Sequence, residues 1–107
     1  MPARFRVRKK AKADLRGIGR YTRKRWDRDQ SNRYLGELDA CFHRLADMPA
    51  LGRPYAPIPP YLRYEQGSHV VFFRRELSGD VVIVRVLHER MLPELHLSEK
   101  DELDENE

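Results

Sequence analysis

The chain has 107 residues, which is the size of one ordinary domain and leaves no room for a second active module. Apolar residues make up 40% and charged residues 36%, so the sequence predicts a small core under a highly charged surface. A single cysteine, Cys41, excludes an internal disulfide and any zinc site built from several cysteines. No apolar run approaches the roughly 20 residues of a membrane span, and the first residues lack the apolar stretch of a signal peptide. We therefore expect a soluble, cytoplasmic protein that does not contact membranes.

Charge is unevenly distributed along the chain. Residues 1–33 hold 13 basic and 3 acidic side chains, whereas residues 98–107 hold one basic and six acidic side chains. The net charge of the whole chain is +4. A basic beginning and an acidic end predict an anionic partner, or an electrostatic mate, for the first third of the chain.

The first elements are a short strand and a helix. Phe5 and Val7 alternate with arginines, which is typical of a half-buried strand. Apolar and small residues then recur at helical spacing, at Ala11, Leu15, Ile18, Thr22 and Trp26. The opposite face of this helix is basic and carries Lys9, Lys12, Arg16, Arg20, Arg23 and Lys24. We expect Trp26 to close the core at the end of the apolar stripe.

A second helix follows the sequence "WDRDQSN", in which Asp29 or Ser31 is expected to act as the N-cap. Its apolar stripe is wide and ends before Pro49, and it contains Tyr34, Leu35, Leu38, Cys41, Phe42, Leu45 and Met48. The short connection between the two stripes predicts an antiparallel helical hairpin. Cys41 lies within the stripe, so we interpret it as a small core residue and not as a nucleophile.

The second half of the chain predicts an antiparallel sheet. Residues 49–60 contain five prolines and have no period, which indicates a stiff, extended connector. Three strand-like runs follow at residues 61–65, 68–76 and 81–88, with two-residue turns expected at 66–67 and 78–79. The predicted fold is an α+β domain of order β-α-α-β-β-β over residues 4–97, with an acidic tail at 98–107.

The turn positions predict a register for the last two strands. His69 would lie opposite His88, Val71 opposite Val86, and Phe73 opposite Val84. The other side of the sheet would then carry Arg63, Val70, Phe72, Arg74, Ile83, Arg85 and Leu87. We expect the helices to cover the first side and the second side to remain an open, half-apolar face. A slip of one residue would exchange the two sides.

Few residues point to catalysis or to a metal. Of the four histidines (His43, His69, His88 and His96), His69 and His88 form the best metal pair, but a histidine pair satisfied by backbone groups is the preferred interpretation. The arginines Arg63, Arg74 and Arg85 together with His88 resemble a set that cleaves phosphodiesters. In the predicted register, however, His88 points away from these arginines. The basic face of the first helix lacks interleaved aromatic side chains, which argues against direct nucleic-acid binding. We expect no cofactor and no metal.

The C-terminal stretch "GSHVVFFRRELSGDVVIVRVLHERM" resembles the ParE branch of the RelE/ParE toxin superfamily. Members carry a G-S-H-x-x-F-[FY]-R run followed by an I-V-R-[VI]-L-H-x-R-M run. The resemblance covers residues 4–97, and the predicted order of elements is that of the family. The sequence departs from the family pattern at Asp27, at Leu92 and in the longer, more acidic tail.

The resemblance implies the toxin of a type II toxin–antitoxin module. Such toxins trap DNA gyrase on cleaved DNA and perform no chemistry of their own. A ParD-like antitoxin with a ribbon-helix-helix domain would neutralise the toxin in a hetero-oligomer and would alone contact operator DNA. One alternative is a RelE-like endoribonuclease that cuts mRNA on the ribosome with Arg63, Arg74, Arg85 and His88. Another is a relative that binds an antitoxin but has lost toxicity.

Two surfaces are candidate binding sites. We expect the antitoxin to lie across the open face of the sheet, where it would contact Arg63, Val70, Phe72, Arg74, Ile83, Arg85 and Leu87. We expect the target to contact the basic first helix and the C-terminal edge of the sheet, at Arg16, Arg20, Arg23, Arg90 and Met91.

Overall fold

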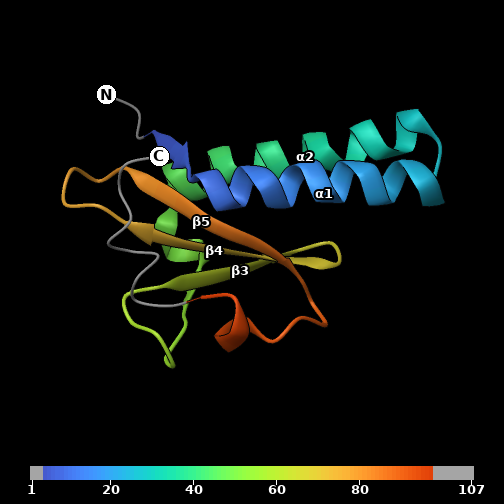
Figure 1. The fold of residues 1–107 in the computed structure, drawn as a ribbon. Helices are drawn as coiled ribbons and strands as arrows, with labels where there is room; N and C mark the ends of the chain where they lie inside the picture. The colour runs from blue at the N-terminus through green and yellow to red at the C-terminus, as the bar shows by residue number, and fades with distance from the viewer. Residues whose placement is uncertain (1–3, 98–107) are drawn as a thin grey trace.

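The computed structural model describes residues 4–97 as two helices packed on one face of a five-stranded sheet (Figure 1). The predicted α+β class is confirmed, and so is the order of its six main elements. In chain order the elements are β1 (Phe5–Val7), α1 (Lys9–Arg25), α2 (Arg28–Asp47), η1 (Pro49–Leu51), β2 (Arg53–Pro54), β3 (Leu62–Gln66), β4 (His69–Arg75), β5 (Val81–His88) and η2 (Pro93–Leu95). Neither α1 nor α2 is long and apolar enough to cross a membrane.

The helical hairpin turns within two residues. Asp27, and not Asp29 or Ser31, caps α2, because its Oδ1 accepts the Gln30 amide at 2.7 Å. Ser31 is instead fully buried, and its hydroxyl lies 2.6 Å from the hydroxyl of Thr22 on α1. The hydrogen bond between these two hydroxyls joins the helices next to the turn, and it gives both buried polar groups a partner.

The sheet has the order β1-β5-β4-β3-β2 and is mixed. β1 pairs with β5 in parallel, whereas the other three pairings are antiparallel. β1 and β5 can pair in parallel because the helical hairpin and the strands between them form the long crossover connection that parallel neighbours require. Beyond the residues that pair with β1, no strand within residues 4–97 lies beside the outer edge of β5.

The predicted register of β4 and β5 holds for only half of the ribbon. His69 lies opposite His88 and Val71 opposite Val86 as predicted, but a bulge between Phe72 and Phe73 places Phe73 opposite Ile83. Val84 is the extra residue of the bulge, so the predicted sides of Ile83 and Val84 are exchanged.

Both predicted turns differ from their observed forms. β3 and β4 are joined at residues 67–68, one residue later than predicted, and Gly67 has a φ of +60°. β4 and β5 are joined by five residues, 76–80, in place of a two-residue turn. The longer loop closes with a hydrogen bond from the Glu76 amide to the Asp80 carbonyl, at 2.8 Å.

The sheet carries a hydrophobic core on each face. The helix-side core contains Ala11, Ile18, Leu38, Cys41, Phe42, Leu45, Val71, Phe73, Val81, Ile83 and Val86. The core on the opposite face, which we call the far face, contains Tyr55, Tyr61, Val70, Phe72, Val82, Val84, Leu87 and Leu97. The expectation of an open face is therefore wrong. The proline-rich segment folds back through a hydrogen bond between the Tyr55 amide and the Tyr61 carbonyl and covers Phe72 from this side.

Candidate functional site

Arg85 ties three parts of the fold together. Asp14 on α1 accepts its Nε at 2.8 Å and its Nη2 at 2.9 Å, and Nη1 donates to the His96 carbonyl at 2.9 Å. Asp14 also accepts the backbone amide of Val86 at 2.9 Å, on the edge of β5 that β1 leaves uncovered. Because the ion pair is bidentate and 14% exposed on each side, it joins α1, β5 and the C-terminal segment.

The far face does not present the surface that was expected for the antitoxin. Val70, Phe72 and Leu87 lie on it as predicted, but each is buried beneath the covering segments. Ile83 lies on the other side of the sheet, in the helix-side core, because of the bulge. Arg63 lies on β3, Arg74 on β4 and Arg85 on β5. Of these three side chains, only that of Arg63 is substantially exposed.

His69 and His88 form the expected pair, with their rings edge to face and 5.4 Å between centroids. The Nδ1 atom of His69 lies 2.5 Å from the Tyr34 hydroxyl, and the Nδ1 atom of His88 accepts the Arg90 amide at 3.1 Å. Because Nδ1 of His88 already accepts this amide, it is not free to bind a metal ion. Burial, followed by the charge of His88, lowers the pKa of His69 and favours its neutral form.

Residues 4–97 contain no group of three or more His, Cys, Asp or Glu side chains placed to hold a metal ion. Burial also raises the pKa of the Cys41 thiol, which lies in the helix-side core. A thiol with a raised pKa is a poor nucleophile and a poor metal ligand, which agrees with its interpretation as a core residue.

The structure does not bring together the four residues of the ribonuclease alternative. His88 faces His69 and lines a groove beside α1, while Arg85 pairs with Asp14. Arg74 lies on the far face at 7% exposure, and Arg63 forms a partly exposed ion pair with Glu65 at 3.4 Å. The three arginines belong to the far face, whereas His88 lies on the helix side of the sheet beside His69, so the histidine does not converge with the arginines on one substrate position.

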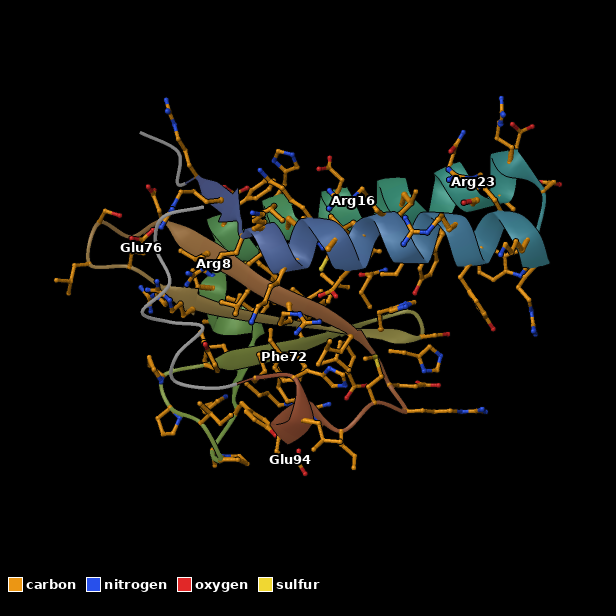
Figure 2. The ribbon with its side chains drawn as sticks, in the orientation of Figure 1. Arg8, Arg16, Arg23, Phe72, Glu76 and Glu94 are labelled. Atoms are coloured by element: carbon orange, nitrogen blue, oxygen red, sulfur yellow. The ribbon has the colours of Figure 1, made fainter. Side chains whose placement is uncertain are left out.

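The predicted arginines of α1 line a groove in the helical hairpin. The groove has a volume of about 590 Å³ and is lined by Val7, Leu15, Arg16, Gly19, Arg20, Arg23, Leu35, Asp39 and Phe42. Its lining joins apolar side chains from β1, α1 and α2 to three arginines from α1, and Figure 2 shows Arg16 and Arg23 along the hairpin. We call it the hairpin groove. Sequence analysis found the arginines but missed the apolar lining, although Leu35 and Phe42 lie seven residues apart on one stripe of α2.

Arg90 and Met91, the other two residues predicted to contact the target, lie at or beside a second groove. This groove runs between α1 and the ends of β4 and β5. It has a volume of about 520 Å³ and is lined by Ala13, Asp14, Gly17, Ile18, Tyr21, His69, Val86, His88 and Met91. Met91 and the adjacent Arg90 are both exposed. Tyr21, at 58% exposure, adds an aromatic wall over which the Arg25 guanidinium lies 5.5 Å from the ring centroid.

Trp26 does not close the core, contrary to expectation. α1 ends at Arg25, and Trp26 has an extended backbone (φ −123°, ψ 177°) that turns its side chain away from the apolar stripe. The indole is 39% exposed and packs edge to face on Tyr34, with 5.7 Å between the ring centroids. Trp26 and Tyr34 therefore form a partly exposed aromatic pair at the turn of the hairpin.

The sequence matches a described protein family and several curated proteins. The family "ParE toxin of type II toxin-antitoxin system, parDE" matches residues 5–93. Toxin ParE1 of Caulobacter vibrioides is 39% identical over 94 residues, which are 87% of this chain and 96% of that protein. Toxin ParE1 of Mycobacterium tuberculosis is 39% identical over 92 residues, which are 85% of this chain and 94% of that protein. Toxin ParE of Escherichia coli is 38% identical over 82 residues, which are 76% of this chain and 80% of that protein.

Two solved structures share the fold. A chain of the chromosomal ParDE toxin–antitoxin system from P. aeruginosa superposes with a TM-score of 0.69 at 16% identity, covering 81% of this chain and 96% of that chain. A chain of the toxin–antitoxin complex RelBE2 from Mycobacterium tuberculosis superposes with a TM-score of 0.60 at 21% identity, covering 82% and 99%. Each of these two chains therefore shares the overall fold described above. With the family match over residues 5–93 and 39% identity across nearly the whole of two curated toxins, the chain belongs to the ParE toxin family of type II toxin–antitoxin systems.

Proposed function

We propose that this protein is a toxin that acts on DNA gyrase in the cytoplasm and blocks replication, and that a ParD-like antitoxin neutralises it. The match to the ParE toxin family over residues 5–93 is the observation that carries this proposal. The similar structures support an antitoxin partner, since both come from systems named as toxin–antitoxin pairs.

The hairpin groove is the proposed binding site for the antitoxin. Its apolar lining, with Leu15, Leu35 and Phe42, suits one face of an amphipathic helix. Its arginines suit carboxylates on the rim of that helix, because a guanidinium pairs with a carboxylate through two hydrogen bonds. The far face is less suitable, because its apolar side chains are already covered by the protein's own segments.

The toxin would act by binding and not by chemistry. The residues proposed to contact the target are Arg16, Arg20, Arg23, Arg90 and Met91, and all five are exposed. The arginines of α1 belong to both proposed interfaces, so an antitoxin in the hairpin groove would compete with the target. The dispersal of Arg63, Arg74, Arg85 and His88 supports binding over phosphodiester cleavage.

Induction of the protein in bacteria, with separate measurements of DNA and protein synthesis, tests this function. DNA synthesis should stop first, and cells should filament with the DNA-damage response induced. Co-expression of the ribbon-helix-helix protein expected from the neighbouring reading frame should restore growth. An early arrest of translation, with mRNA cut within codons, would support the ribonuclease alternative and overturn the gyrase proposal. Unaffected growth at high expression would support a relative that has lost toxicity.

A further inference from the structure

The second groove presents two imidazole nitrogens to a ligand. His69 and His88 lie opposite each other on β4 and β5, and both line the groove. The Nδ1 atom of His69 lies 2.5 Å from the Tyr34 hydroxyl. The Nδ1 atom of His88 accepts the Arg90 amide at 3.1 Å, so its neutral ring carries its hydrogen on Nε2. The Nε2 atom of each ring therefore remains for a ligand, and that of His88 can donate to an oxygen atom.

Tyr21 forms an aromatic wall of the same groove. Its side chain is 58% exposed and lies on one line of α1 with Gly17 and Arg25, which are four residues before and after it. A Cβ atom built on Gly17 would meet the flexible end of the Arg20 side chain at 3.8 Å, which is an ordinary contact, so α1 leaves space beside the ring. The Arg25 guanidinium lies over the ring, 5.5 Å from its centroid. An exposed ring beside a guanidinium offers a stacking surface for a base and a cation for its phosphate.

A second exposed aromatic side chain lies next to the groove. Trp26 is 39% exposed and packs on Tyr34, whose ring in turn lies 5.5 Å from that of His69, between centroids. The sequence argued against nucleic-acid binding because the basic face of the first helix lacks interleaved aromatic side chains. The structure removes this objection, since Tyr21 and Trp26 are both exposed at the end of α1, whose last turn is basic. Stacking rings among cations are typical of surfaces that bind single-stranded nucleic acid.

The charge around the groove favours an anionic ligand. Arg25 lies on one wall, and Arg90 is exposed beside the other. Asp14 also lines the groove, but its carboxylate already belongs to the largely buried ion pair described above. Glu89, whose charge acts on His69, offsets one of the two guanidinium groups. The remaining cation and the imidazole donors suit a phosphodiester, whose oxygens accept hydrogen bonds and carry a negative charge.

We propose that the second groove binds single-stranded DNA, with one base stacked on Tyr21 and its phosphate at His88 and Arg90. Trp26 stacks a neighbouring base. The groove volume of about 520 Å³ lies within the roughly 300–1,000 Å³ of pockets that hold ligands the size of a nucleotide. A base inside a duplex is stacked on both faces and does not reach the ring, so the site selects single strands. Only the choice of DNA over RNA rests on the proposed function, which brings the protein to DNA held by gyrase.

Fluorescence anisotropy of a labelled oligothymidylate tests this site on the full-length chain. A strand of about 15 nucleotides in about 50 mM salt should bind the wild type, and Tyr21→Ala should weaken binding at least about fivefold, the effect of losing one stacked base. Tyr21→Phe keeps the ring and should bind as the wild type does. Gly17→Leu fills the space beside the ring and should also weaken binding, while leucine favours the helix more than glycine does.

Matched charge variants separate this site from general attraction to a polyanion. Arg25→Gln with Arg90→Gln should weaken binding at least about tenfold, because it removes both cations beside the groove. Arg53→Gln with Arg75→Gln removes the same charge at exposed positions of β2 and β4 and should weaken binding less than about threefold.

Three further ligands decide the class of partner. A DNA duplex of the same length and a polyglutamate peptide should each compete poorly with the oligothymidylate, and oligouridylate should bind no more tightly than it. No binding in low salt, unchanged binding by Tyr21→Ala, equal losses for the two arginine pairs, effective competition by the duplex or the peptide, or tighter binding of the RNA would each overturn the proposal. The assay contains no gyrase, so intact DNA binding without inhibition of gyrase would overturn the proposed function alone.

Discussion

At the scale of single residues, the contact between Asp14 and Arg85 explains most about how the fold holds its C-terminal end. The sequence analysis predicted that Arg85 contacts an antitoxin, but the arginine pairs with a carboxylate of its own chain. Spacing along a strand identifies the chemistry of such a residue. It does not identify the partner, because Asp14 lies 71 residues away and meets Arg85 only after α1 has packed beside β5.

Asp14→Ala should destabilise the fold by about 3 kcal/mol, because it removes the carboxylate that accepts from both the largely buried Arg85 guanidinium and the Val86 amide. Glu76→Ala removes the exposed partner of Arg6 and should cost less than about 1 kcal/mol. Urea denaturation of both variants measures the difference. Similar losses of stability would show that the buried position of the first pair adds nothing.

His69 should make stability depend on pH. Burial and the charge of His88 lower the pKa of His69 from its ordinary value of 6.5, whereas Glu89 and Asp14 oppose this shift. The unfolded chain therefore binds a proton more readily than the folded chain. The contribution of His69 is complete well above pH 6.5 and is lost as the pH falls through 6.5 towards the lower, folded pKa.

Unfolding free energies measured between pH 8 and pH 5 check this direction. His69→Gln should lose less stability than the wild type over this range. An equal loss in the wild type and in His69→Gln would contradict the assignment to His69.

At the scale of elements, periodicity predicted the helices and the identity of the strands, but not the local irregularities. The central residues of both predicted stripes are buried as expected, namely Ala11, Ile18 and Thr22 in α1 and Leu38, Cys41, Phe42 and Leu45 in α2. Met48, the last residue of the second stripe, is instead 59% exposed. The bulge at Val84 was missed because the run "VVIVRVLH" is apolar on both faces, so neither face resists a shift of one residue. The covering of the far face was missed because residues 55–61 have no period that indicates a packed surface.

The cap of α2 provides a test at this scale. Asp27→Ala should cost about 1 kcal/mol, because it removes the acceptor of the Gln30 amide. Asp29→Ala, in the first turn of the same helix, removes only a favourable interaction with the helix dipole and should cost a few tenths of a kcal/mol. Thermal denaturation of the pair distinguishes them, and a greater loss for Asp29→Ala would place the cap where the sequence analysis expected it.

Trp26→Ala should leave the protein folded and cost about 1–2 kcal/mol, well below the 3–5 kcal/mol of a core tryptophan. The indole is partly exposed and loses mainly its contact with Tyr34. Circular dichroism with thermal melting measures this cost. Loss of the cooperative transition would show that Trp26 belongs to the core after all.

At the scale of the whole molecule, the fold separates a helical side with a basic groove from a far face closed by the protein's own segments. The basic side of α1 was predictable, because charge and helical period define it together. The apolar lining of the groove comes from β1, α1 and α2 together. It could not be predicted from the apolar stripe of any one helix, because it depends on how α2 and β1 pack beside α1. The proposed function depends on the arginines of this groove, since they would meet both the target and the antitoxin.

The supercoiling and cleavage activities of purified gyrase, measured with increasing amounts of this protein, test the central claim most directly. The wild type should inhibit supercoiling and accumulate cleaved DNA bound to gyrase. Arg16→Glu with Arg20→Glu should require at least about tenfold more protein, the effect of losing roughly 1.4 kcal/mol of binding, while Lys24→Glu on the same helix should behave as the wild type. Unimpaired gyrase at every concentration, together with cleavage of ribosome-bound mRNA by the same preparation, would contradict the account.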